Sequence, residues 1–250
     1  MTDRDDAYDF RAPRLHVDDD LREHAVVALP REQTNYLVNV LRLGDGATVH
    51  VFNGRDGEWL GRIARRGRRD VVLEIASQTR PQAGGPDLHY LFAPLKRTRL
   101  DYMVQKATEL GSARLRPVIT RHTVAERINI DRMRANVIEA AEQCGILRVP
   151  DVDAPVSLKR ALETWNDERR LVFCDEDAPV RDPIEALRQI GPGPLAVLIG
   201  PEGGFAPDER EMLCGFRGVV RVALGPRIMR ADTAAVAALS LANAVLGDWR

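Results

Sequence analysis

The sequence lacks any apolar run approaching the length of about 18 residues that suggests a membrane-spanning helix. Its first ten residues, MTDRDDAYDF, are acidic and polar, which is the wrong chemistry for a secretory signal. Cysteine is scarce: Cys144, Cys174 and Cys214 are widely spaced and form neither a disulfide framework nor a metal-binding motif. We therefore expect a protein of the reducing cytoplasm, with no membrane partner and no metal.

Several common catalytic signatures are also missing. There is no GxxxxGK[ST] phosphate loop, no HExxH zinc motif and no GxSxG nucleophile elbow. The stretch GPGPLA (191–196) matches GxGxxA, but it precedes a strand-like run, and Pro192 and Pro194 would spoil a helix start. The histidines are scattered, and we expect each to be a surface or core residue and not a ligand: His16, His24, His50, His89 and His122.

Lysine is the third scarcity, since only three of the 36 basic residues are lysine. The formal net charge is -1, but arginine gathers in RIARRGRR (62–69), which holds no acid, and a second basic stretch begins in PLKRTR (94–99). Such clusters can contact nucleic-acid phosphates. A general preference for arginine along the whole chain would give the same pattern, so charge alone leaves both interpretations open.

The composition changes at SQTRPQAGGPD (77–87), which has two prolines, two adjacent glycines and no large apolar residue. Such a stretch is typical of a linker. We predict one domain over 1–78, a linker over 79–87 and a second domain over 88–250.

The first domain reads as short strands with one small helix, a pattern that favours a compact barrel. The helix pattern spans 31–44, and NGRDG (53–57) is a hairpin signal. The predicted strands are 24–29, 47–52, 58–64 and 70–76.

The second domain alternates strands and helices, which indicates an α/β fold. Helices are predicted over 99–111, with its apolar face on Leu100, Met103, Val104, Ala107 and Leu110, and over 132–145, with Asp131 as cap. The last helix, 232–247, is apolar all round, so we expect it to be buried in the core or in a subunit interface. The predicted strands are 88–95, 170–176, 195–200 and 219–224.

The last three strands each end in an unusual loop. The first runs into Asp175 and Glu176, the second into PEGGF (201–205) and the third into GPRIMRADTAA (225–235). Because ligands bind outside the carboxyl ends of parallel strands, these loops predict one pocket. A plain turn would not require Glu202 between a proline and two glycines, so the main chain here is shaped for close approach.

Two of these segments resemble a known family. LIGPEGGF (198–205) and LGPRIMRADTAA (224–235) resemble the signature of the SPOUT methyltransferases, which have a C-terminal trefoil knot. More narrowly, three stretches resemble the 16S ribosomal RNA uridine-N3 methyltransferases: YLVNVLRLGDG (36–46), KRTRLDYMVQKATELG (96–111) and EAAEQCGILRVP (139–150). The matches span roughly residues 30 to 246 and so cover both predicted domains.

The resemblance implies a PUA-like β-barrel at the N-terminus, a knotted SPOUT domain that binds S-adenosylmethionine, and a homodimer. It implies methylation of N3 of a specific uridine in 16S rRNA, within the small ribosomal subunit. Two alternatives stay open: a SPOUT methyltransferase acting on transfer RNA or 23S rRNA, and a catalytically silent RNA-binding protein.

The family's cofactor loops, carried over by position, imply contacts from both motifs. Two departures from the family's pattern are Asp232, where glutamate is usual, and Ile146, where arginine is usual; Arg148 either takes over that role or does not. The implied cofactor-binding residues are Leu198, Ile199, Gly200, Glu202, Gly203, Gly204, Leu224, Gly225, Ile228, Met229, Arg230, Thr233 and Ala234.

Two of these residues are also our catalytic candidates. Glu202 either holds an arginine at the site or only favours the helix start at 206–211, and Arg230 either stabilises the developing uracil anion or a phosphate, or forms a structural ion pair. No general base stands out. The residues expected to contact RNA are Arg65, Arg66, Arg68, Arg69, Lys96, Arg97 and Arg99.

Overall fold

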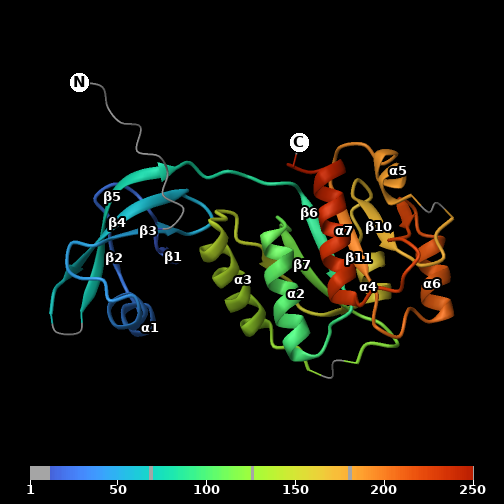
Figure 1. The fold of residues 1–250 in the computed structure, drawn as a ribbon, viewed down its shortest axis with the longest axis horizontal. Helices are drawn as coiled ribbons and strands as arrows, with labels where there is room; N and C mark the ends of the chain where they lie inside the picture. Colours follow the sequence, from blue (N-terminus) through green and yellow to red (C-terminus); the bar gives the residue numbers. More distant parts are fainter. Residues whose placement is uncertain (1–11, 68–69, 125–126, 180–181, 250) are drawn as a thin grey trace. The chain divides into compact units, whose positions relative to one another are not determined.

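The computed structural model describes residues 12–67, 70–124, 127–179 and 182–249. The chain forms two compact units, of which the first comprises Met1–Gly84 together with Ala141–Val149. The second comprises Gly85–Ala140 and Pro150–Arg250 (Figure 1). A short segment from the middle of the sequence thus belongs to the N-terminal unit.

Five strands form the sheet of the first unit, in the order β1-β3-β4-β5-β2. The parallel pair is β1 with β3, and the other neighbours are antiparallel. Every strand places apolar side chains in one shared core, so the sheet curves around that core as a half-barrel. The bounds are β1 Arg14–His16, β2 Val26–Ala28, β3 Thr48–Phe52, β4 Glu58–Arg65 and β5 Val71–Arg80.

The predicted helix of this unit is present but shorter and partly irregular. Helix α1 (Arg31–Asn35) continues directly as the π-helical segment η1 (Tyr36–Val40), which buries Leu37 completely in the barrel core. The chain leaves the helix at Arg42, whose φ of +58° is left-handed. The strand predicted over 70–76 is longer than expected, because β5 continues to Arg80 and its last residues join a buried polar network.

Seven strands form the sheet of the second unit, in the order β12-β10-β11-β6-β7-β8, with β9 also paired to β7. All pairs are parallel. Strand β11 is buried at every position, as expected for a central parallel strand covered on both faces. The bounds are β6 Leu88–Phe92, β7 Arg114–Ile119, β8 Asp151–Val152, β9 Val156–Ser157, β10 Arg170–Cys174, β11 Leu195–Ile199 and β12 Val219–Val222.

Helices cover both faces of this sheet. Alternate strand residues such as Leu171 and Leu198 pack with α4 and α6. On the opposite face the Tyr90 hydroxyl lies 2.9 Å from the Met103 sulfur of α2, and α2 and α7 lie side by side (Figure 1). The predicted α/β fold class is therefore confirmed. The bounds are α2 Arg97–Glu109, α3 Ile130–Cys144, α4 Leu158–Glu163, α5 Pro183–Arg188, α6 Pro207–Cys214 and α7 Ala231–Val245.

One expectation about helices needs correction, and another is met on one face only. The side chain of Asn129, and not that of Asp131, accepts the N–H of Arg132 (2.9 Å) at the start of α3, because Asn129 stands just before the first helical residue. The last helix is buried on one face only: Val236 and Leu241 remain partly exposed on α7. Over the described ranges, no helix has the length and apolarity needed to cross a membrane.

Candidate active site

The carboxyl ends of β12, β10 and β11 lie next to one another, because these strands are neighbours and parallel. The three loops singled out in the sequence therefore start at one edge of the sheet. Since neighbouring strands are about 4.8 Å apart, the loops after β11 and β12 begin about 10 Å from each other.

The loop after β10 is anchored by a buried carboxylate. Asp175 is 6% exposed and accepts from Arg221 Nε (2.7 Å) and Arg210 Nη2 (3.1 Å), so it ties the loop to β12 and α6. Burial, with a contribution from the Asp175 charge, raises the pKa of the Cys174 thiol to about 12, so this thiol is unreactive near neutral pH. Asp175 is thus a scaffold for the site.

The loop after β11 has an internal reason for one of its glycines. A Cβ at Gly200 would lie 2.5 Å from Cε2 of Phe205, so Phe205 fills the space that a side chain would need. The Phe205 ring packs edge-on against Phe173 at 5.3 Å. Leu198 and Ile199, just before it, are buried within the strand. The first glycine of GPEGGF therefore lets the loop fold back on the sheet.

The other two glycines differ from each other. A Cβ at Gly203 would lie 3.4 Å from Cβ of His122, a tight contact, whereas Gly204 has open space around it and a φ of +71°. The Gly204 carbonyl accepts from Nδ1 of His122 at 3.0 Å. Open main chain is therefore present at Gly204, and again at Gly225 in the third loop (φ +99°).

Glu202 has a partner within the chain. It forms an ion pair with Arg99 of α2, and both side chains are about 40% exposed (41% and 39%). At the start of α6, Glu209 accepts from the backbone N–H of Ala206 (3.1 Å) and of Arg121 (2.8 Å). Glu209 thus caps the start of α6, which was one of the two roles considered for Glu202. The ion pair with Glu202 holds Arg99 at the loop.

The loop after β12 is open to solvent. Ile228 is 94% exposed, Arg230 is exposed, and Leu224 and Met229 are half-buried. Within the described part of the chain, Arg230 shows no ion pair with either candidate acid: Glu202 holds Arg99, and Asp232 accepts from the N–H of Thr233 at 2.9 Å. Arg230 is the N-cap residue of α7, with Thr233 exposed and Ala234 buried in the first turn.

A fourth loop reaches the same sheet edge and was missed by the sequence analysis. It follows β7, a strand that was not predicted and that contains Pro117, a residue that argues against a sheet interior. Pro117 is accommodated since it lies between the residues paired with β8 and those paired with β9. The turn after β7 brings Arg121 to Asp208 of α6 (2.7 Å) and His122 to Gly204.

The predicted RNA-binding residues are distributed over both units. Arg65 and Arg66 lie exposed at the end of β4 in the first unit, and Arg68 and Arg69 lie outside the described residues. In the second unit, Lys96 and Arg97 line an open cavity of about 1190 Å³ between the starts of α2 and α3. Two further arginines line it, Arg127 and Arg132, neither of which the sequence analysis singled out.

One of these arginines is already committed to an acid. Arg132 donates to Asp101 through Nε (2.8 Å) and Nη2 (2.6 Å), and this hydrogen bonding, which outweighs burial, lowers the pKa of Asp101. Asn136 also donates to Asp101 at 2.8 Å. The cations of the cavity without such an internal carboxylate partner in the described structure are Lys96, Arg97 and Arg127.

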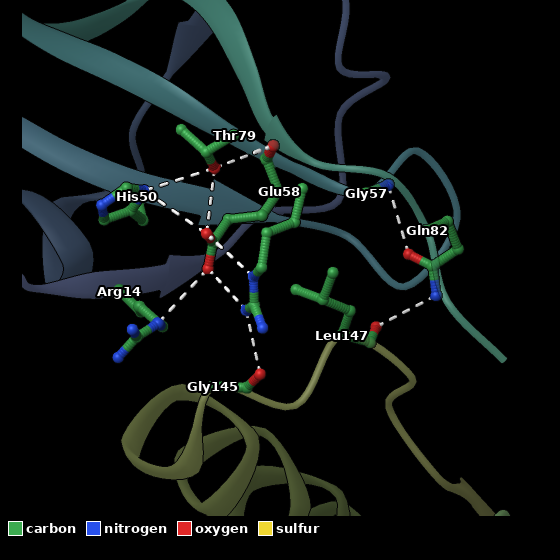
Figure 2. A network of polar contacts seen from close by, with 9 residues as sticks. Arg14, His50, Gly57, Glu58, Thr79, Gln82, Gly145 and Leu147 are labelled. Atoms are coloured by element: carbon green, nitrogen blue, oxygen red, sulfur yellow. Dashed lines mark hydrogen bonds and ion pairs between the residues drawn. The ribbon is translucent and has the colours of Figure 1, made fainter. Parts of the chain in front are cut away.

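The segment after α3, part of the EAAEQCGILRVP motif, is clamped within the first unit. Glu58 is fully buried and accepts from Arg80 Nη2 (2.8 Å), Thr79 Oγ1 (2.9 Å) and Arg14 Nε (3.3 Å). Figure 2 shows Arg14, His50 and Thr79 pointing toward this carboxylate. Arg80 Nη2 also donates to the Gly145 carbonyl at 2.9 Å, so the buried acid orients the arginine that holds the end of α3.

The same segment packs by apolar contact. Leu147 and Ala141 form a small core with Phe52 of β3, and Ile146 packs against it. Ile146, where the family usually has arginine, therefore serves here as a packing residue. Gly145 has a φ of +64°, and a Cβ there would meet the Arg14 guanidinium at 3.4 Å, so this glycine both ends α3 and admits the arginine.

Comparison with known proteins matches both units to family models of RNA methyltransferases. The family model described as "RNA methyltransferase domain" matches residues 84–243, and that described as "RNA methyltransferase PUA domain" matches residues 29–76. A curated relative, the ribosomal RNA small subunit methyltransferase E of Rickettsia conorii, is 28% identical over 229 residues, which cover 91% of this chain and 93% of the relative.

Two solved structures are similar over nearly their whole length. A Legionella pneumophila protein, in complex with bound SAM, shares 29% identity with a TM-score of 0.85, covering 95% of this chain and 99% of that one. The ribosomal RNA small subunit methyltransferase E of Neisseria gonorrhoeae, bound to S-adenosyl methionine, shares 25% identity with a TM-score of 0.83, covering 96% and 100%. On the match of its larger unit, this chain belongs to the RNA methyltransferase family.

Proposed function

We propose that the protein is a cytoplasmic enzyme that transfers a methyl group from S-adenosylmethionine to N3 of a specific uridine in 16S rRNA. The relatives named above act, by their names, on small-subunit ribosomal RNA, and two structural neighbours hold the cofactor. The observation that carries the proposal is the meeting of three loops at adjacent parallel strand ends, with open main chain at Gly204 and Gly225.

The cofactor would lie against these loops and would supply a methyl group bound to a sulfonium. The residues present fit such a group, because adenosine can be held by main-chain N–H and C=O groups where side chains are absent. Gly204 and Gly225 offer that bare backbone. The apolar side chains of Leu224, Ile228 and Met229 lie on the third loop and can pack against the ligand.

Catalysis would depend mainly on positioning. Holding the uracil N3 and the methyl group in near-attack geometry supplies about 7–11 kcal/mol. A cation placed at the negative charge that develops on uracil lowers the barrier further. Arg230 is the candidate, since it is exposed at the sheet edge and the two acids considered as its partners make other contacts in the described structure. Glu202 then orients Arg99.

We also propose that the enzyme acts as a homodimer. Ile228 is 94% exposed, an unusual state for a large apolar side chain in a site loop, and α7 keeps Val236 and Leu241 only partly buried. A second copy covering α7 and the third loop would remove these surfaces from water. Size-exclusion chromatography with light scattering at micromolar concentration tests this, and a monomer there would contradict it.

Methyl transfer itself is the test of the proposed function. Purified protein with radiolabelled S-adenosylmethionine is expected to label 16S rRNA, either free or within the small subunit, at a single uridine, and nuclease digestion should yield N3-methyluridine. Transfer RNA and 23S rRNA serve as alternative substrates. Labelling of either of them instead would show that the enzyme methylates a different RNA. A protein that binds RNA but neither binds the cofactor nor labels the RNA would be the catalytically silent RNA-binding protein.

A charge reversal in the α2–α3 cavity tests the RNA contacts. Lys96→Glu with Arg97→Glu is expected to weaken RNA binding and to reduce the salt slope by about 0.7–0.9 for each phosphate that the variant no longer neutralises. Affinity for S-adenosylmethionine should stay unchanged. Arg99 is left out because its substitution would also release Glu202. The matched control is Arg160→Glu, an exposed arginine on α4, and an unchanged slope in the double variant would contradict the assignment.

A further inference from the structure

Resting on that proposed function, we propose that His122 is the general base that removes the N3 proton of the target uracil. The reaction needs such a group, because N3 carries a weakly acidic proton and its lone pair becomes strongly nucleophilic only when that proton leaves. The sequence indicated no general base within the two cofactor motifs. His122 lies outside both motifs, in the turn after β7.

The position of His122 places it at the candidate site. Strand β7 is parallel to β6, and β6 to β11, so the turn after β7 emerges at the same sheet edge as GPEGGF. Its side chain contacts that loop directly: Nδ1 is 3.0 Å from the Gly204 carbonyl, and its Cβ is next to Gly203. His122 is thus adjacent to the open main chain against which the cofactor is proposed to lie.

The hydrogen bond to Gly204 sets the tautomer. A carbonyl oxygen can only accept, so Nδ1 of His122 must carry the proton that it donates. In the neutral imidazole, Nε2 is then the atom with the free lone pair. His122 is exposed, so this lone pair is available to a substrate. The loop therefore holds the imidazole in the form that a base requires.

Other titratable groups near this edge have different tasks. Glu202 is paired with Arg99, and the buried Asp175 is shared by Arg221 and Arg210. Among the described residues, the charged groups that the structure pairs at the His122 turn and its neighbour loop belong to the turn itself, to PEGGF, to α2 and to the start of α6. They are Glu202 with Arg99, Asp208 with Arg121, and Glu209, which accepts from the Arg121 backbone.

The step balances without a further reactant. Nε2 of His122 accepts the N3 proton and becomes part of an imidazolium, N3 forms its bond to the methyl carbon, and the carbon–sulfur bond breaks with its electron pair left on sulfur. The products are N3-methylated uridine, the neutral thioether of the cofactor and protonated His122. The imidazolium returns its proton to solvent, which its exposed position permits.

The test compares His122→Gln with the natural enzyme. Glutamine carries amide N–H donors but is not basic near neutral pH. We expect kcat for RNA methylation to fall about 100-fold or more, with the Kd for S-adenosylmethionine unchanged in calorimetry. The natural enzyme should lose kcat in acid, where protonation of Nε2 removes the lone pair that the step requires, and the variant should lack this inflection.

Two further variants complete the design. His122→Ala should recover part of its activity when imidazole is added, whereas His24→Asn, which changes an exposed histidine of the first unit, should behave as the natural enzyme. Full activity with an unchanged pH profile in His122→Gln overturns the inference, and so does loss of cofactor affinity, which would make His122 a support of the loop. Failure of the natural enzyme to methylate RNA would instead refute the proposed function.

Discussion

Replacing Glu58 by alanine is expected to lower the free energy of unfolding by about 3–5 kcal/mol, the usual cost of removing one partner from a buried ion pair. The carboxylate is fully buried and accepts from two arginines and a threonine. Without it, Arg14, whose side chain is 3% exposed, loses its ion pair with Glu58. Urea denaturation followed by circular dichroism measures the change.

A matched variant separates this effect from the loss of any surface acid. Glu74→Ala removes a carboxylate of the same sheet that is 56% exposed and lies 3.9 Å from Arg66, so a change of at most about 1 kcal/mol is expected. Equal effects of the two substitutions would show that the Glu58 network contributes little. The Glu58 variant should also expose the 145–149 segment to amide exchange, because Arg80 would no longer be held toward Gly145.

The largest effect on ligand binding is expected from Gly204→Val. A branched side chain at this position would occupy the open space beside the main chain on which the cofactor is proposed to rest. We expect the affinity for S-adenosylmethionine to fall at least about 100-fold, or about 2.8 kcal/mol. Isothermal titration calorimetry with the purified variant measures it directly.

Gly191→Val is the control for backbone strain. Gly191 has a φ of +74°, against +71° for Gly204, and both have nothing within 4 Å of the added Cβ. The two variants should therefore lose similar stability, about 1–2 kcal/mol from the left-handed conformation. A normal affinity in Gly204→Val, or an equal loss in both variants, would place the cofactor elsewhere than on this loop.

Much of the fold follows from the sequence. The apolar runs that became β6, β10, β11 and β12 are buried parallel strands, and glycines at 111 and 145 end α2 and α3. The strands that escaped prediction have physical reasons. β1 has three residues, and β8 and β9 have two each, which is too short for a periodic pattern. β7 contains Pro117, which lies between the residues paired with β8 and those paired with β9.

The candidate site was predictable in its loops but not in its contacts. Strand ends and glycines indicated the sheet edge, because they depend on local sequence. The Glu202–Arg99 pair joins residues far apart in sequence, and so does the contact between His122 and Gly204. Such pairings arise from strand order, which no local pattern encodes. The sequence around His122 did not indicate a site, because only the pairing of β7 with β6 brings the turn after β7 to this sheet edge.

The assignment of Ala141–Val149 to the N-terminal unit has a consequence for dissecting the protein. The chain after Gly84 looks like a natural place to truncate the protein. Such a truncation would remove Leu147, which packs against Phe52, and the Gly145 carbonyl, which accepts from Arg80. A stand-alone version of the N-terminal unit would therefore need those nine residues supplied in trans, or grafted through a loop. The N-terminal unit therefore cannot be isolated as one continuous stretch of sequence.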